Sequence, residues 1–238
     1  MYYVVIDTET CDGQGRKLAY PSPRDALVYD IGWLVVDSTG EVVERRSIIV
    51  SDTFNRTDLM ASAYYADKVP GYVERIRRGE VQTMSALDAF HLLAHDVERY
   101  RVRDAWAYNA KFDRTVIDAT IRHYSNGFAD LATMFPRLRF RDIWDFASCI
   151  TGTRPYVEWC KTHGFVSAKG NPITNAERVY GYLTDSPDYV ESHTALADCY
   201  TELAILQAAK RRKKRTRHTM GQGWRDAARV AREMHEED

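Results

Sequence analysis

The N-terminal stretch decides the fold of this chain, and it reads Tyr3-Val4-Val5-Ile6-Asp7-Thr8-Glu9 (residues 3–9). Its β-branched and aromatic residues predict a strand over Tyr3–Ile6, with an acidic pair where that strand ends. Since successive strand residues point to opposite faces, Asp7 and Glu9 would project together. Two adjacent carboxylates repel one another unless a cation lies between them, and hard oxygen ligands favour Mg²⁺ or Mn²⁺ over zinc. A solvated pair at a strand end is the alternative interpretation.

Two further strands are predicted after a loop. Residues Cys11–Pro23 contain two glycines and two prolines, which is typical of a loop. Val28–Val36 and Val42–Val50 are rich in β-branched residues, and the residues 37–40 between them form a turn sequence of the hairpin type. The first part of the chain therefore predicts a three-stranded antiparallel meander.

Strands and helices alternate in the rest of the chain. Apolar residues recur at spacings of three and four from Met84 onward, which predicts a helix with one buried face. The predicted elements are a short helix at Tyr72–Arg77, a helix at Met84–Val97, a strand at Asp104–Tyr108, a helix at Asp113–Tyr124, a strand near Leu138–Asp142, short helices within residues 143–184, a helix at Thr194–Lys210 and a short helix at Trp224–Met234. Residues 51–80 are mixed and give no clear pattern. This order predicts an α/β sheet with helices on its faces.

The composition is that of an ordinary globular protein. The chain has 238 residues, of which 45% are hydrophobic and 28% charged. No apolar run approaches the roughly 20 residues of a membrane helix, and the apolar start is too short for a signal peptide. The four cysteines lack the paired spacing of a zinc site or a disulfide framework. We therefore expect a cytoplasmic protein with reduced thiols and no membrane association.

Basic residues are concentrated near the C-terminus. The net charge is −1, yet seven of the 33 basic residues lie within Lys210–Arg217, where there is no acidic residue. These residues are Lys210, Arg211, Arg212, Lys213, Lys214, Arg215 and Arg217. They predict local contact with the phosphates of a polyanion, although cations also complement the C-terminal end of a helix. We expect residues 1–209 to form one domain and residues 210–238 to form a basic segment with a short helix, whose Trp224 and Met234 offer an apolar face to a protein partner.

A second acidic position follows the predicted strand Asp104–Tyr108. The stretch Asn109-Ala110-Lys111-Phe112-Asp113 comes directly after it. Ligands lie beyond strand ends in open α/β sheets, so Asp113 would lie beside the first strand. The alternative is structural, with Asp113 as a helix cap and Asn109 as a turn residue.

A third acidic position opens the long helix predicted from Thr194. Asp198 would lie in the first turns of a mostly apolar helix, where a carboxylate is unusual unless it caps the helix or binds a ligand. His193 precedes the helix on a segment able to move, which suits a general base that must reach a water. A surface histidine followed by an acidic residue in the first turn is the alternative.

Together, the three patterns resemble the motifs of the DEDD superfamily of 3′–5′ exonucleases, specifically its DEDDh (DnaQ-like) branch. The motifs match as Asp7-Thr8-Glu9, as Asn109 with Phe112-Asp113, and as His193 with Asp198 five residues on. The sister DEDDy branch has Tyr four residues before the final Asp, where this chain has Thr194. The resemblance extends from about residue 3 to residue 207. It implies a ribonuclease H-like fold, with three antiparallel strands followed by parallel strands and helices on both sides.

The resemblance also implies a role for each acidic residue. Asp7 would bridge two Mg²⁺ ions, for which Mn²⁺ would substitute. Glu9 and Asp198 would hold the ion that binds the attacking water, and Asp113 would hold the other ion. His193 would take the proton from that water. The implied enzyme is a two-metal phosphodiester hydrolase.

The implied substrate is the 3′ end of a nucleic acid. The backbone near Thr8 and the side chains of Asn109 and Phe112 would fix the terminal nucleotide or shape its pocket, although Phe112 fits a core position equally well. Nucleoside 5′-monophosphates would be released, with single-stranded DNA as the expected substrate. An exoribonuclease or oligonucleotide nuclease with the same site is the first alternative, because the motifs do not reveal contacts to a 2′-OH. A catalytically inert nucleic-acid-binding module is the second. The chain departs from the family over residues 51–80, 150–190 and beyond 210, which leaves the choice of substrate open.

Overall fold

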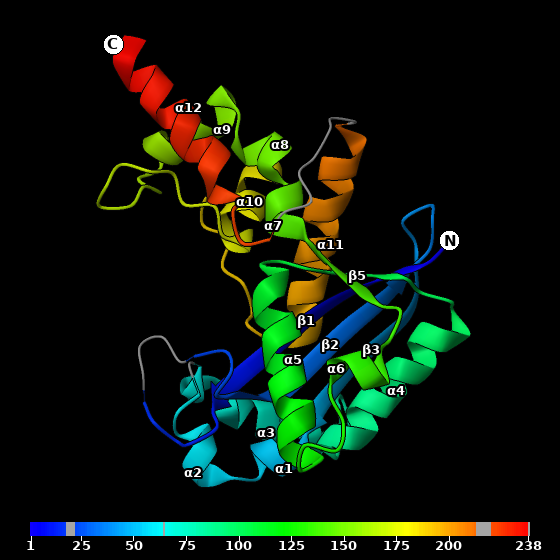
Figure 1. Ribbon diagram of the computed structural model, residues 1–238. Helices are drawn as coiled ribbons and strands as arrows, with labels where there is room; N and C mark the ends of the chain where they lie inside the picture. The colour runs from blue at the N-terminus through cyan, green and yellow to red at the C-terminus, as the bar shows by residue number, and fades with distance from the viewer. Residues whose placement is uncertain (18–21, 64, 213–219, 238) are drawn as a thin grey trace. The chain divides into compact units, whose positions relative to one another are not determined.

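The structure is a computed structural model that describes residues 1–17, 22–63, 65–212 and 220–237 (Figure 1). The first half of the chain contains β1 (Tyr3–Asp12), β2 (Ala26–Val36), β3 (Val42–Val50), α1 (Ser51–Phe54), α2 (Thr57–Met60), the 3₁₀ helix η1 (Ala66–Lys68), α3 (Val69–Arg77), β4 (Gln82–Met84), α4 (Ala86–Arg99) and β5 (Asp104–Ala107). The second half contains α5 (Ala110–Tyr124), α6 (Leu131–Met134), β6 (Arg139–Asp142), α7 (Ile143–Phe146), α8 (Ser148–Thr151), α9 (Arg154–Thr162), α10 (Ala176–Leu183), α11 (Ala195–Arg211) and α12 (Trp224–Glu237).

Six strands form one mixed sheet in the order β4-β3-β2-β1-β5-β6. β2 pairs antiparallel with both β1 and β3, whereas β3 pairs parallel with β4. The prediction of an α/β fold with a mixed sheet flanked by helices is confirmed. The edge strand β4 is an addition to the predicted elements, because its three residues are too few to show the two-residue period of a strand.

The first strand is longer than predicted. β1 extends to Asp12, so Asp7 and Glu9 lie inside the strand rather than at its end, and the loop begins at Gly13. The extension arises because β2 begins at Ala26 and pairs with Asp12, beyond a shift in register after Glu9. Pairing with a neighbouring strand thus continues a strand whose own side chains turn polar after residue 6.

The helix boundaries differ from the predicted ones by a few residues. α5 begins at Ala110, so Asp113 lies in its first turn and the interpretation of Asp113 as a helix cap is wrong. α4 begins after Ser85, whose side chain accepts a hydrogen bond from the N–H of Asp88, and Met84 belongs to β4 instead. These ends depend on capping and strand pairing, which the apolar period does not record.

The chain divides into two compact units. The first comprises Met1–Ala105, Phe112–Phe140 and His193–Cys199, and the second comprises Trp106–Lys111, Arg141–Ser192 and Tyr200–Asp238. A domain boundary between residues 209 and 210 stays a prediction.

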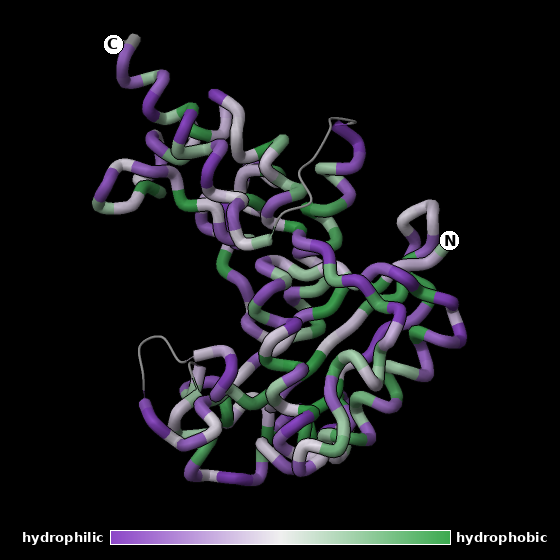
Figure 2. The backbone as a smooth tube through the Cα atoms, in the orientation of Figure 1, coloured by the Kyte–Doolittle hydropathy of each residue, from purple (hydrophilic) through white to green (hydrophobic). Residues whose placement is uncertain are grey.

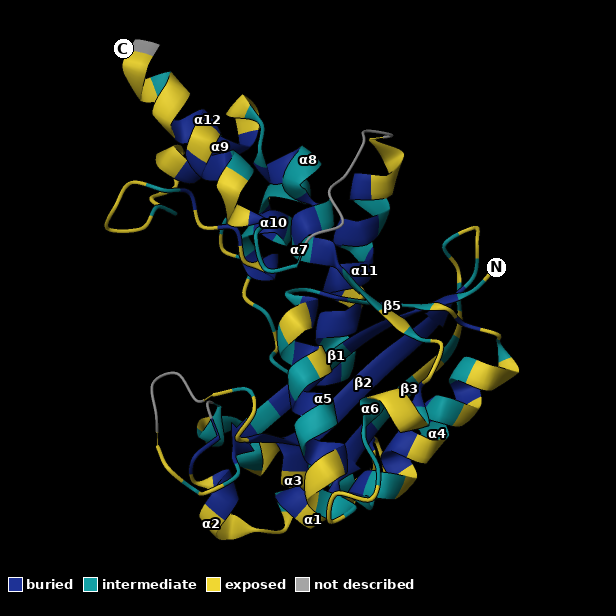
Figure 3. Ribbon diagram, in the orientation of Figure 1, coloured by how far each residue is buried: buried dark blue, intermediate teal, exposed yellow. Residues whose placement is uncertain are grey.

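Strand β2 lies at the centre of the first unit. All of its residues are buried, as Figure 3 shows in dark blue. Trp33 donates through Nε1 to the buried Asp96 of α4 at 3.1 Å. The neighbouring Gly32 faces the start of α11, where an added Cβ would lie 2.4 Å from the nitrogen of Leu196. Because consecutive strand residues point to opposite faces, α4 covers one face of β2 and the first turn of α11 covers the other.

Helix α12 packs within the second unit. Val230 and Ala231 of α12 contact Val157 of α9, with the partly buried Met234 beside them. Figure 2 shows hydrophobic and hydrophilic residues alternating along α12, as expected for a helix with one buried face. The apolar face that the sequence offers to a protein partner is therefore covered at Met234, whereas Trp224 is 45% exposed.

Two further findings concern the cysteines and the helices of the described residues. No disulfide joins the four cysteines, all of which lie in the described ranges. Three of the four are buried. None of the helices in those ranges combines the length and the apolar character needed to cross a bilayer.

The substitution Gly32→Ala tests the close approach of α11 to β2. The added Cβ would meet main-chain atoms of Ala195 and Leu196 at 2.4–2.6 Å, and rotating a side chain cannot relieve such contacts. We expect the free energy of unfolding, measured with denaturant, to fall by about 1–3 kcal/mol or more, as for overpacked cores.

Gly71→Ala in α3 is the control for this substitution. Nothing lies within 4 Å of the added Cβ there, and alanine stabilises a helix relative to glycine by about 0.5–1 kcal/mol. Unchanged stability in Gly32→Ala, or equal losses in both variants, would contradict the packing of α11 against β2.

Candidate active site

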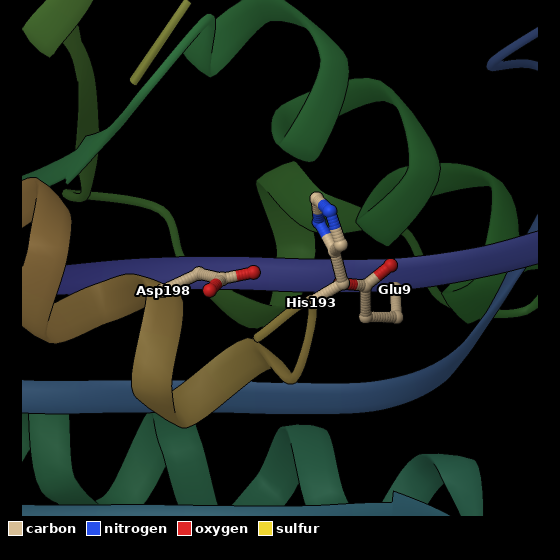
Figure 4. A group of neighbouring side chains, drawn as sticks. All are labelled: Glu9, His193 and Asp198. Atoms are coloured by element: carbon tan, nitrogen blue, oxygen red, sulfur yellow. The ribbon is translucent and has the colours of Figure 1, made fainter. Parts of the chain in front are cut away.

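Side chains from β1, from α11 and from the segment before α11 meet in the first unit (Figure 4). Ligand atoms of Glu9, His193 and Asp198 lie within 4.8 Å of one another. Glu9 and Asp198 are only 8% and 7% exposed, whereas His193 is half-buried. Residues far apart in the chain therefore share one site on β1.

A buried carboxylate on β2 fixes the start of α11. Oδ2 of Asp30 accepts hydrogen bonds from the N–H of Ala195 at 3.0 Å and from the hydroxyl of Tyr72 at 2.8 Å. Burial raises the pKa of Asp30 to about 6, while these two hydrogen bonds act to lower it. Asp30 pairs with Glu9 in the ladder between β1 and β2. The same two strands therefore carry Glu9 and hold the helix that brings Asp198.

His193 is held in an uncommon backbone conformation. Its φ of 52° lies in the left-handed region, which few residues other than glycine adopt without support from their surroundings. The hydroxyl of Tyr72 shares its one proton between Asp30 and the carbonyl oxygen of His193, which accepts the longer branch of this bifurcated hydrogen bond at 3.3 Å. The ring of Tyr65 stacks on the imidazole, with centroids 3.9 Å apart and ring planes 15° apart. Both the main chain and the ring of His193 thus have partners from residues 65–72.

Asp113 also lies beside β1. The hydroxyl of Thr8 donates to Oδ1 of Asp113 at 2.9 Å, and both residues are buried. Thr8 stands between Asp7 and Glu9, so the first turn of α5 is tied to the acidic stretch of β1. Asp7 itself is half-buried and pairs with Gly32, the residue that admits α11. All five side chains proposed for catalysis belong to the first unit.

Sequence patterns leave out three residues that organise this site. Asp30 carries a signal in retrospect, because an acidic residue inside the buried apolar run Ala26–Val36 requires hydrogen-bond partners. Tyr65 and Tyr72 lie within residues 51–80, where no period or motif marks them. Only the three-dimensional arrangement assigns them to the site.

The side chains of Glu9, His193 and Asp198 fit a divalent cation. Two nearly buried carboxylates bring like charges together, which is unfavourable unless a cation or a proton lies between them. Carboxylate oxygens are the preferred ligands of Mg²⁺ and Mn²⁺, and an imidazole also binds Zn²⁺. The donor set therefore fits a divalent metal without selecting one.

The predicted substrate residue Asn109 belongs to the second unit. Its φ is 63°, and its N–H donates to Oδ1 of Asp142 at 3.1 Å. The other carboxylate oxygen of Asp142 accepts from the N–H of Gly221 at 2.7 Å. Burial raises the pKa of Asp142. One carboxylate thus holds both the turn before α5 and the segment before α12.

The remaining predicted contact residues lie in different parts of the structure. Phe112 is half-buried in the first unit. Lys210 and Arg211 occupy the last turn of α11, where Nζ of Lys210 lies 5.7 Å from the ring centroid of Trp106. Four of the seven clustered basic residues lie outside the described residues, namely Lys213, Lys214, Arg215 and Arg217.

The fold of this chain is similar to that of several solved exonuclease structures. No protein-family model matches this sequence, and a comparison with curated proteins gives no match either. The chain is similar to the crystal structure of E. coli exonuclease I in complex with a dT13 oligonucleotide, with a TM-score of 0.54 and 18% identity over 89% of this chain and 41% of that chain. It is also similar to exonuclease I without ligand (TM-score 0.55, 18% identity, 89% and 42% covered) and to a moderately thermophilic exonuclease I from Methylocaldum szegediense (TM-score 0.52, 18% identity, 89% and 41% covered).

This likeness shows the fold. At 18% identity it does not assign the activity, and the chain spans only about 41–42% of the length of these solved chains.

The substitution Thr8→Val tests the link between β1 and Asp113. Valine keeps the shape of threonine but removes the hydroxyl that donates to the buried carboxylate. We expect the free energy of unfolding of the metal-free protein to fall by about 1–3 kcal/mol, the usual cost of removing a hydrogen-bond partner from a buried polar group. Thr8→Ser retains the hydroxyl, and its free energy of unfolding should fall clearly less than that of Thr8→Val. Equal stability of the valine and serine variants would show that this hydrogen bond does not hold Asp113.

Proposed function

We propose that this chain is a metal-dependent 3′–5′ exonuclease of the DEDDh branch, which acts on the 3′ end of single-stranded DNA and releases nucleoside 5′-monophosphates. The observation that carries the proposal is that ligand atoms of Glu9 from β1, of His193 and of Asp198 from α11 lie within 4.8 Å of one another in one unit. Asp113 adds a carboxylate from a further element through its bond with Thr8. Carboxylates from two elements beside a histidine suit metal-assisted hydrolysis of a phosphodiester.

The likeness to solved structures supports a nucleic-acid substrate. E. coli exonuclease I, whose fold this chain shares over 89% of its length, is solved in complex with dT13 and with dA16 oligonucleotides. Single-stranded DNA is therefore the first substrate to test. RNA is the alternative, because discrimination depends on contacts to the 2′-OH. Matched DNA and RNA strands, single and double, distinguish the two.

Four carboxylates are proposed to hold the metal: Asp7, Glu9, Asp113 and Asp198. Two Mg²⁺ ions are proposed, with Mn²⁺ as a substitute. Bound there, the metal would stabilise the charge that develops on the phosphate and lower the pKa of the attacking water. β1 suits this task because paired strands hold side chains more rigidly than a loop would.

His193 is proposed to accept the proton of the attacking water. A general base must lie within hydrogen-bond reach of its proton and be largely unprotonated near neutral pH, and histidine meets the second condition by its ordinary pKa. A ring nitrogen of His193 lies within 4.8 Å of carboxylate oxygens of Glu9 and Asp198, which are proposed to hold the metal that binds this water. The bond from Tyr72 to its carbonyl oxygen keeps His193 beside them.

Substrate contacts are proposed for three predicted residues and for the basic segment. Thr8, through its main chain, and the side chains of Asn109 and Phe112 would fix the terminal nucleotide. The basic segment Lys210–Arg217 would add affinity for phosphates irrespective of sequence. A protein partner at the C-terminal helix would meet Trp224, which is exposed, whereas Val230 and Ala231 pack against Val157 of α9. A cytoplasmic location stays a prediction.

Removal of single site residues tests the catalytic assignment. We expect Asp7→Ala and Asp198→Ala to abolish release of nucleotides from a 3′-terminal substrate with Mg²⁺, with the fold retained by circular dichroism. His193→Ala should lower turnover by about 10²–10⁴, the usual contribution of a general base. Glu98→Ala, an exposed acidic residue of α4, is the control and should retain activity. Unimpaired cleavage by Asp198→Ala would refute the assignment, and an inactive wild type would favour the inert module.

Neutralisation of the basic segment tests its interaction with phosphates. With the seven residues changed to Gln, the slope of log affinity against log salt for single-stranded DNA should flatten by about 0.7 for each phosphate that the segment neutralises. Arg77→Gln with Arg78→Gln, at exposed positions where α3 ends, is the control and should leave the slope unchanged. An unchanged slope in the neutralised segment would reject this interaction.

A further inference from the structure

A tyrosine ring covers the imidazole of the proposed general base. The ring centroids of Tyr65 and His193 are 3.9 Å apart, and the ring planes are 15° apart, so the rings form a close parallel stack. Both residues are half-buried and belong to the first unit. None of the motifs in the sequence includes Tyr65.

Other bonds hold the main chain around His193. The hydroxyl of Tyr72 donates to its carbonyl oxygen, and Asp30 accepts from the N–H of Ala195 two residues on. These bonds act on the backbone, whereas the orientation of the imidazole depends on the choice of side-chain torsions. The stack restricts that choice, because the imidazole cannot turn out of plane without moving into the ring of Tyr65 or separating from it.

The plane of the imidazole matters because the ring lies beside two carboxylates. A ring nitrogen of His193 lies within 4.8 Å of carboxylate oxygens of both Glu9 and Asp198. A general base acts only when its lone pair points at the proton it removes, and a misplacement of about 1 Å lowers a rate by about 10²-fold. Setting the plane of the ring before the substrate arrives therefore has a measurable effect on turnover.

The neighbours of Tyr65 hold it in turn. Nζ of Lys68 lies 5.3 Å from the centroid of the Tyr65 ring, within the range of a cation–π interaction. The N–H of Lys68 donates to the carbonyl oxygen of Tyr65 at 3.0 Å, which joins Tyr65 to the helix η1. Tyr72 follows in α3. Residues 65–72 therefore contact His193 twice: the ring of Tyr65 stacks on its imidazole, and the hydroxyl of Tyr72 contacts its main-chain carbonyl oxygen.

We propose that Tyr65 is a positioning residue for His193, whose imidazole plane it sets by stacking. The proposal rests on the proposed function of His193 as general base. Tyr65 acts through His193, so its effect on turnover requires the histidine to be present.

The stack itself can be measured without activity. In the metal-free protein at fixed pH, the ring current of Tyr65 should shift the carbon-bound ring protons of His193 upfield in the NMR spectrum, and His193→Gln assigns these resonances by their loss. We expect Tyr65→Phe to preserve the upfield shift and Tyr65→Leu to abolish it. Phe128→Leu removes an aromatic ring that is 92% exposed and should leave the resonances in place. Unmoved His193 resonances in Tyr65→Leu would overturn the proposal.

Kinetics then test the positioning role. Tyr65→Leu should lower kcat by about 10-fold to 10²-fold with little change in KM. Tyr65→Phe, which keeps an aromatic ring, should retain most of the wild-type kcat. In the His193→Gln background, Tyr65→Leu should hardly lower kcat any further, because the effects of substituting residues that act as a unit are not additive. A full additional loss in the double variant would contradict the proposal.

The two measurements distinguish the proposals from one another. An inactive wild type with a shifted His193 would reject the proposed function while the stack stands. An active wild type whose turnover does not respond to Tyr65→Leu would reject the positioning role alone.

Discussion

The first turn of α11 lies directly on β2, and the arrangement of the site depends on that contact. It is possible because residue 32 is glycine: a Cβ there would lie 2.4 Å from the nitrogen of Leu196. Gly32 is the partner of Asp7 in the ladder, so the helix begins over the acidic residues of β1. Asp30, one position along the same face, accepts the N–H of Ala195 and fixes where the helix starts. His193 and Asp198 follow from that starting point, just before the helix and in its first turn.

The same packing creates an electrostatic problem that a bound cation would relieve. Glu9 and Asp198 have ligand atoms within 4.8 Å of one another and are only 8% and 7% exposed, so water has little access to their charges. Buried carboxylates near one another destabilise a fold unless protons, hydrogen bonds or cations compensate for them. The protein compensates in part, as the hydroxyl of Thr8 does for Asp113. The repulsion that remains between the carboxylates of Glu9 and Asp198 is typical of functional sites. A cation bound beside β1 would relieve it.

The sequence was informative where the chemistry is local. The stretch Val42–Val50, rich in β-branched residues, predicted β3 with its true bounds, and the three- and four-residue spacings located α4, α5 and α11 within a few residues. It failed where tertiary contacts decide, as in the extension of β1 to Asp12 and the edge strand β4, which exist because neighbouring strands pair with them. The spacing of Asp7 and Glu9 could suggest a shared site, yet no pattern in residues 51–80 pointed to Tyr65 or Tyr72. Aromatic contacts between residues more than a hundred positions apart leave no period in the chain.

Anomalous diffraction from a crystal of the wild-type protein soaked in Mn²⁺ tests the central claim most directly. The account predicts manganese peaks bounded by the carboxylates of Asp7, Glu9 and Asp198, with Asp113 on the same side, and their loss from crystals of Asp7→Ala. Manganese bound only elsewhere, or an Asp113 carboxylate turned away from the ions with no water between them, would contradict it.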